Sequence, residues 1–549
     1  MRDYLKRLLT TGAAYQFGDI LAKGLALITL PLYTRHVSTE GYGAAESLLT
    51  AVILSSILLR AGVGEAFIRF YFDDSDPVRR ERITRTAVAA VAWTTTVASL
   101  VAVAFAGELS KLLLGYDDPQ LIDCAILGLW AFTNLEMAYA QLRVDERTRV
   151  YVYASGANVV MTVTFTVALV VFAGQGARGL LLGNFGASAL VVLGLWFLLR
   201  RRWPKRGPIG ETFAPPDRET PVSPNRPASP NRPALKASVS RFRSLRVNWA
   251  DLSAMLRFGL PTVPADASVY ALQVADRFYL LRVYSESSAG LYAVALKLAT
   301  VVFVAVRGFQ YAWPPLAYSI ESDEEAARLY SLVTTYYALA TGVVVCAVAL
   351  LGRWMVRLLA GPEFFGAYKA LPWLALGWAL YGLYLVFIVI AGRARVTSRN
   401  FPAAGAGLAV NVALLVLLVP HGGANLGIAG AGLALCGAYA VMLVVMYLLT
   451  RDLFRVGFQW LRLAQLTAIL AGVAVSGELL LPTSGFAGLA LRVAWLGLVP
   501  VLLLATRFFA PHEWDQARAL LADGRRRVAA FRARGGEVEE YAEDPLKDL

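Results

Sequence analysis

Charged side chains interrupt several of the long apolar stretches in this sequence of 549 residues. A charge near the centre of a bilayer costs about 2.5–3.5 kcal/mol on insertion scales, so such residues mark water-filled paths or binding sites. Cations spaced along such a path form a ladder, and an Arg can grip two oxygens of one phosphate at once. The pattern therefore predicts a cationic cavity for an anionic cargo such as a phosphate or a diphosphate. The predicted cargo ligands are Lys23, Arg60, Arg277, Lys297 and Arg307.

Acidic and amide side chains occur in the same stretches. They could balance the cations or carry coupling protons or sodium ions, and they could also be paired or solvated. Asp19 and Lys23 have the four-residue spacing of an ion pair within one helix, whereas Asp276 and Arg277 could be solvated at the outer end. The acidic candidates are Asp19, Glu65, Asp266 and Asp276, and the candidates for polar lining are Gln16, Gln273 and Gln310. Arg492, near the end of its stretch, is expected to extend to the membrane interface.

No catalytic or metal-binding motif accompanies these residues. The histidines His36, His421 and His512 are far apart in the sequence. No glycine-rich phosphate loop ends in Lys-Ser or Lys-Thr, which argues against ATP-driven transport by this chain. The three cysteines stand alone, so neither a disulfide framework nor a zinc site is indicated. We expect a transporter rather than an enzyme, with no metal and no cofactor beyond coupling H⁺ or Na⁺.

Membrane-spanning helices must position these side chains. Apolar residues make up 57% of the chain and charged residues 17%, and the apolar residues come in long blocks. A helix needs ~20 mostly apolar residues to span a bilayer. The sequence therefore predicts an all-α polytopic membrane protein of about fourteen transmembrane helices, and the polar candidates fall in the first, second, seventh and eighth. The predicted spans are 10–34, 43–66, 84–107, 120–142, 151–173, 178–199, 254–281, 288–313, 329–352, 369–392, 402–420, 427–450, 461–481 and 486–508.

The net charge of +13 reflects orientation rather than a nucleic-acid partner. With a cytoplasmic N-terminus, most of the 52 Lys and Arg residues fall on the inner segments, as the positive-inside rule requires. We expect both termini in the cytoplasm.

Two segments lie outside the predicted spans. The segment 201–250 is rich in Pro, Arg and Ser and repeats one hexapeptide at 223–228 and 229–234, so we expect a disordered tether, with partner or lipid binding as the alternative. The tail 509–549 has apolar residues at helical spacing among arginines, which suits an interfacial helix or a plain solvated one. The predicted divisions are 1–200 with six spans, the linker 201–250, 251–450 with six spans, 451–508 with two, and the tail.

A weak internal repeat relates the two halves. Arg60 precedes an acidic cluster by the same interval at which Arg307 precedes another, and Gly41 and Gly290 then align within two residues. The match predicts two lobes of like topology about an axis along the membrane normal. Prolines such as Pro31 and Pro261 could bend the helices that carry the charges.

Two stretches carry a family resemblance. One is 30–43, Leu-Pro-Leu-Tyr-Thr-Arg-His-Val-Ser-Thr-Glu-Gly-Tyr-Gly, and the other runs from Phe258-Gly-Leu-Pro through Val274-Ala-Asp-Arg-Phe to Trp313-Pro-Pro. They resemble the polysaccharide biosynthesis family of O-antigen flippases, in the superfamily of multidrug, oligosaccharidyl-lipid and polysaccharide (MOP) exporters.

The resemblance implies a fourteen-helix, two-lobe transporter of the bacterial cytoplasmic membrane. Its central cationic cavity would carry an undecaprenyl-diphosphate-linked oligosaccharide to the outer leaflet by alternating access. The implied partners are this lipid-linked oligosaccharide, membrane lipids, and the polymerase and glycosyltransferases of the pathway.

Three alternatives remain at the level of sequence. A multidrug cation antiporter of the same superfamily would favour an acidic cavity and usually twelve spans. A membrane glycosyltransferase or polymerase would usually have a large outer loop, whereas the predicted outer loops are short. A scaffold that recruits polysaccharide enzymes would act through the linker.

Overall fold

The computed structural model describes helices and short connections and, within the described residues, no strand. Twelve of the described helices are long and apolar enough to cross a membrane, and the chain is a multi-pass membrane protein. The described residues are 24–73, 76–145, 147–200, 247–318, 320, 322–393, 399–420, 422–453 and 455–509. Outside them lie Gln16, Asp19 and Lys23, most of the predicted linker and almost all of the predicted tail.

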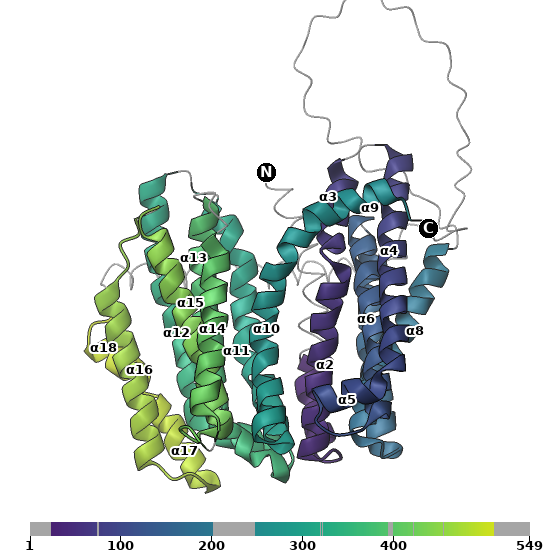
Figure 1. Ribbon diagram of the computed structural model, residues 1–549. Coiled ribbons are helices and arrows are strands. Elements are labelled where there is room, and N and C mark those ends of the chain that lie inside the picture. The colour runs from purple at the N-terminus through teal and green to yellow at the C-terminus, as the bar shows by residue number, and fades with distance from the viewer. Residues whose placement is uncertain are drawn as a thin grey trace, which may run out of the picture.

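Figure 1 shows the helices in two groups, with the helices that precede the linker on the right and those that follow it on the left, except α9, which lies beside α3 and α4 on the right. Before the linker, α6 packs against α2, α4 and α8, and α7 packs against α8. The helices of this N-terminal half are α2 (Thr39–Arg60), α3 (Val63–Asp73), α4 (Pro77–Ala104), α5 (Ala106–Leu113), α6 (Pro119–Val144), α7 (Thr148–Val167) continued by η1 (Ala168–Phe172), and α8 (Gly176–Arg200).

After the linker, α13 lies at the centre of its group and packs against α11, α12 and α15. Helices α16 and α17 pack on the outer side of α12, at the left edge of Figure 1. The elements of this C-terminal half are α9 (Trp249–Gly259), η3 (Leu260–Thr262), α10 (Val263–Tyr279), η4 (Leu280–Tyr284), α11 (Glu286–Tyr318), α12 (Asp323–Leu359), η5 (Pro362–Lys369), α13 (Leu371–Arg393), α14 (Asn400–Leu418), α15 (Gly427–Thr450), α16 (Trp460–Leu480), α17 (Gly485–Leu496) and α18 (Leu498–Ala505).

The bundle has two ends, which we name by their connections. The linker end is where α8 stops and α9 begins, and it also carries α3, at the top of Figure 1. The loop end is opposite, where α2 begins and where α5 and α17 lie.

The fourteen predicted spans account for all the long helices. The first predicted span contributes a described helix at Gly24–Tyr33, and its earlier residues lie outside the described part. The seventh, predicted as one stretch at 254–281, is divided among α9, η3 and α10. Pro261 lies in the break, because a proline cannot donate the backbone hydrogen bond that would continue the α-helix.

Helix α9 is held by the N-terminal half although it follows the linker. The guanidinium of Arg82 on α4 donates to the Asp251 carboxylate at 2.7 Å. Gly62, which has a left-handed φ of +71°, lies so close to Gly259 that a Cβ there would stand 2.2 Å from the Gly259 carbonyl oxygen. The broken span therefore starts on one half, and its α10 portion packs against both α2 and α14.

The internal repeat is visible in the helix starts. The interval in sequence between Arg60 and Arg307 is the same as that between Thr39 and Glu286. Thr39 and Glu286 are the first residues of α2 and α11. The hydroxyl of Ser38 caps α2 by accepting from Gly41 N at 3.2 Å, and that of Ser285 caps α11 by accepting from Ser288 N at 3.1 Å. The same interval in sequence separates the two capping serines, so α2 and α11 begin in the same way in the two halves.

Candidate functional site

Helices α2 and α11 meet at the loop end through two glycines. A Cβ on Gly290 would lie 2.0 Å from the carbonyl oxygen of Thr39, and a Cβ on Gly43 would lie 2.5 Å from that of Glu286. Small residues allow helix backbones to approach this closely within a membrane. The approach is possible only while both positions lack a side chain.

Further contacts join the halves around this crossing. Ser287 donates to the Thr39 hydroxyl at 2.9 Å, Gly361 N donates to the Thr34 hydroxyl at 2.9 Å, and Arg282 donates to the Lys111 carbonyl at 2.9 Å. We call this set the loop-end seal. It consists of Thr34, Thr39, Gly43 and Lys111 from the N-terminal half, and Arg282, Ser287, Gly290 and Gly361 from the C-terminal half.

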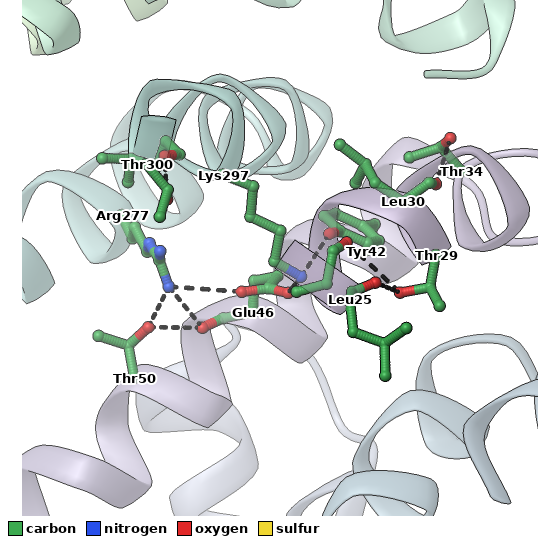
Figure 2. A network of polar contacts seen from close by, with 12 residues as sticks. Leu25, Thr29, Leu30, Thr34, Tyr42, Glu46, Thr50, Arg277, Lys297 and Thr300 are labelled. Carbon is green, nitrogen blue, oxygen red and sulfur yellow. Dashed lines mark hydrogen bonds and ion pairs between the residues drawn. The ribbon is translucent and has the colours of Figure 1, made fainter. Parts of the chain in front are cut away.

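An ion-pair network crosses the boundary between the halves and joins α2 to α10 and α11 (Figure 2). Lys297 on α11 donates to the Glu46 carboxylate, and to the Tyr42 hydroxyl at 2.7 Å. Arg277 on α10 donates to the Glu46 carbonyl at 3.1 Å and to the Thr50 hydroxyl, and its Nη1 lies 3.6 Å from the Glu46 carboxylate. The structure thus brings together two of the five predicted cations, Arg277 and Lys297, around one carboxylate.

The partners on α2 form a polar stripe. Tyr42, Glu46 and Thr50 are four residues apart in turn, so they lie on one face of the helix. Burial rises from the cations to the carboxylate: the side chain of Lys297 is 28% exposed, that of Arg277 16% and that of Glu46 8%. Lys297 therefore has the most accessible side chain of the three charged residues.

The network carries a net positive formal charge. Two cations face one carboxylate, which leaves one positive charge uncompensated among these three residues. Arg277 Nε is buried without an acceptor among the described residues. A buried donor without a partner is costly, so an oxygen-rich anion that reached it would be bound favourably.

Asp276, the neighbour of Arg277 in sequence, points into the C-terminal half. Its side chain is accessible over only 1% of the surface, it accepts from the Tyr292 hydroxyl at 2.6 Å, and it accepts from Asn411 Nδ2 on α14 at 3.0 Å. The alternative that Asp276 is solvated at the outer end is therefore wrong. Its carboxyl is buried within one half, next to Arg277 in sequence, and its described hydrogen bonds go to Tyr292 and Asn411 rather than to the boundary network.

The other predicted site residues lie elsewhere or have no described side chain. Arg60 ends α2 toward the linker end, half-buried, with its Nε 3.4 Å from the Ser56 carbonyl. Glu65 is exposed on α3, and Gln310 is half-buried on α11. The backbones of Asp266 and Gln273 belong to α10 and that of Arg307 to α11, but their side chains lie outside the described part, as do Gln16, Asp19 and Lys23 entirely.

Arg492 does not extend to the membrane interface, so that expectation is wrong. It is 0% exposed and donates to Glu478 at 2.7 Å, to the Leu350 carbonyl at 3.1 Å and to the Pro482 carbonyl at 3.1 Å. Arg353 contacts the same Glu478 carboxylate. This cluster fastens α16 and α17 to α12 within the C-terminal half.

No group of three or more His, Cys, Asp or Glu residues that could hold a metal ion occurs in the described part of the chain. The described polar groups instead offer charge pairing and hydrogen bonding at the boundary between the two halves. Such an arrangement can bind an anion and respond to its presence by a change in how the halves contact each other.

Comparison with known protein families places the chain in one of them. The family described as "Polysaccharide biosynthesis protein" matches residues 9–316. Among curated proteins, no sequence matches this chain.

Solved structures match most of the chain at low identity. A structure titled "Lipid II flippase MurJ, inward closed conformation" is 13% identical with a TM-score of 0.66, and the match covers 91% of this chain and 99% of that chain. A multidrug resistance MATE family transporter of the MOP superfamily is similar in its inward-facing conformation, at 13% identity, a TM-score of 0.59 and coverage of 79% and 96%. A structure of such a transporter in the outward-facing conformation is 12% identical, with a TM-score of 0.53 and coverage of 81% and 94%. These likenesses show that the chain shares the fold of these structures.

Proposed function

The chain belongs to the polysaccharide biosynthesis protein family and has the MOP transporter fold, and from this premise we propose that it is a flippase for a lipid-diphosphate-linked oligosaccharide. The cargo is an undecaprenyl-diphosphate-linked sugar repeat, which moves from the cytoplasmic to the outer leaflet of a bacterial inner membrane by alternating access. The finished repeat then passes to the polymerase of cell-surface polysaccharide synthesis.

One observation carries the proposal. Arg277 and Lys297 lie together at the boundary between the halves, with only one carboxylate between them. Their excess positive charge suits a diphosphate, and a guanidinium can bind two of its oxygens. A cationic drug, the cargo expected of a multidrug antiporter, would be repelled by the same charges. The other predicted ligands, Lys23, Arg60 and Arg307, would extend the cationic path.

The orientation follows from charge. Lys and Arg residues are concentrated at the linker end, so we place that end and both termini in the cytoplasm. The loop-end seal then closes the outer side, and the cargo enters from the cytoplasm. The similar flippase structure is titled inward closed, a description that concerns that protein.

Coupling to an ion gradient is assigned to Asp276. A buried carboxyl can exchange a proton or bind a sodium ion, and the two groups that donate hydrogen bonds to Asp276, the Tyr292 hydroxyl and the Asn411 amide, are neutral. Asp276 neighbours the cargo cation Arg277 on α10, but its hydrogen bonds go to Tyr292 and Asn411.

The direct test uses the purified full chain in liposomes that contain a fluorescent undecaprenyl-diphosphate oligosaccharide. The movement of the label to the opposite leaflet is followed with a membrane-impermeant quencher. We expect faster movement than in protein-free vesicles, and no acceleration for a phospholipid with the same fluorophore. Equal rates with and without protein would contradict the proposal.

A further inference from the structure

The counter-ion of the two boundary cations comes from the opposite half. Arg277 and Lys297 belong to α10 and α11, whereas Glu46 belongs to α2. Every described polar contact of the Lys297 ammonium is made to α2, through Glu46 and Tyr42. The network therefore joins the halves, unlike the Glu478 cluster, whose members all belong to the C-terminal half.

The exposed fractions of the Lys297 and Glu46 side chains indicate the side from which an anion approaches. Glu46 is nearly enclosed, while the Lys297 side chain keeps 28% of its surface accessible. An incoming anion thus meets the Lys297 side chain before it meets the carboxylate. Arg277 Nε, buried without a described acceptor, is a second donor available to the anion once the network rearranges.

We propose that Glu46 is an internal anion which the cargo diphosphate must displace, and that this displacement releases α2 from α10 and α11. The proposal rests on the proposed function and names a residue that regulates the same site. A diphosphate carries more than one negative charge, so it cannot share two cations with a carboxylate without like-charge repulsion. Lys297 and Arg277 remain with the cargo, and Tyr42 and Thr50 lose their donors.

The release acts directly on the loop-end seal. Gly43 precedes Glu46 by less than one helical turn, and Thr39 precedes it by about two turns. Both residues lie in close contact with α11. When Glu46 loses its partners, the attraction that holds this part of α2 against α11 disappears. An empty carrier stays sealed at the loop end, and a loaded carrier opens there.

The first arm of the test measures binding. Inorganic pyrophosphate is titrated into the purified full chain in detergent, and Kd is determined by calorimetry. Removal of the competing charge by Glu46→Gln should lower Kd by about tenfold or more. Glu478→Gln is the matched control, because Glu478 also sits between two arginines but within one half. It should leave Kd unchanged. Glu46→Asp, which keeps the charge on a shorter side chain, should give an intermediate Kd and serves if Glu46→Gln fails to fold.

The second arm measures the seal. Thr39→Cys and Ser287→Cys replace hydroxyls whose oxygens lie 2.9 Å apart, and the yield of the disulfide between them reports closure. Pyrophosphate should lower this yield in the parent, and Glu46→Gln should lower it without pyrophosphate. Glu46→Gln could leave both the Kd and the disulfide yield unchanged, while the parent binds pyrophosphate and Lys297→Gln abolishes that binding. This result would overturn the displacement of Glu46 and leave the proposed function standing. A parent that binds no pyrophosphate would overturn both.

Discussion

The glycine crossing offers a test of the loop-end seal that leaves every charge in place. In Gly290→Ala the new Cβ would stand 2.0 Å from the Thr39 carbonyl oxygen, whereas real Cβ contacts are essentially never shorter than 3.0 Å. The helices α2 and α11 must therefore separate by about 1 Å at this level. Overpacking of this kind typically costs about 1–3 kcal/mol in the closed state.

Because the strain exists only while the seal is closed, it shifts the balance toward the open state by about 5- to 150-fold. The assay is the disulfide yield between Thr39→Cys and Ser287→Cys, measured with and without Gly290→Ala. We expect the yield to fall sharply. Gly194→Ala on α8 is the control, because a Cβ there meets nothing within 4 Å. A yield as high in Gly290→Ala as in the control would refute the argument that this close contact defines the seal.

Three other predictions concern the groups outside the boundary network. Arg492→Met removes a buried donor from Glu478 and the carbonyls around it. The folded state should lose about 1–3 kcal/mol because these acceptors lose their donor; this is seen as a lower Tm in detergent, and an unchanged Tm would contradict the fastening role. Asp276→Asn keeps hydrogen bonding but removes the ionisable group, so transport should no longer respond to an imposed H⁺ or Na⁺ gradient; a retained response would exclude Asp276 as the coupling group. Arg82→Gln breaks the contact with Asp251, so limited proteolysis should cut α9 faster, and equal cleavage would show that this contact does not anchor α9.

The sequence predicted the helices well because the bilayer imposes a strong and simple constraint. A run of ~20 apolar residues has few alternatives to a membrane span. The internal repeat, found from Arg60 and Arg307, correctly related the starts of α2 and α11. The break after Gly259 was signalled by Pro261, but the attachment of α9 to the N-terminal half was not, because it depends on Arg82 and Gly62, which are remote in sequence.

The site was predicted only in part. Arg277 and Lys297 were identified as buried cations, yet their counter-ion Glu46 was missed because it lies close to the predicted start of its span. A signal was present: Tyr42, Glu46 and Thr50 repeat every four residues in an apolar helix. Which cations this stripe faces is a tertiary property of the contact between the halves. The same limit explains Arg492, whose partner Glu478 lies on another helix.

The central claim is that the boundary cations bind the cargo diphosphate during transport. The most direct measurement is the rate of leaflet exchange of an undecaprenyl-diphosphate oligosaccharide in liposomes that contain Lys297→Gln, with Arg149→Gln, an exposed cation on α7, as the control. We predict that Lys297→Gln reduces the rate to that of protein-free vesicles while its folded yield and Tm stay near the parent values, and that the control keeps the parent rate. A parent-like rate in Lys297→Gln would contradict the account.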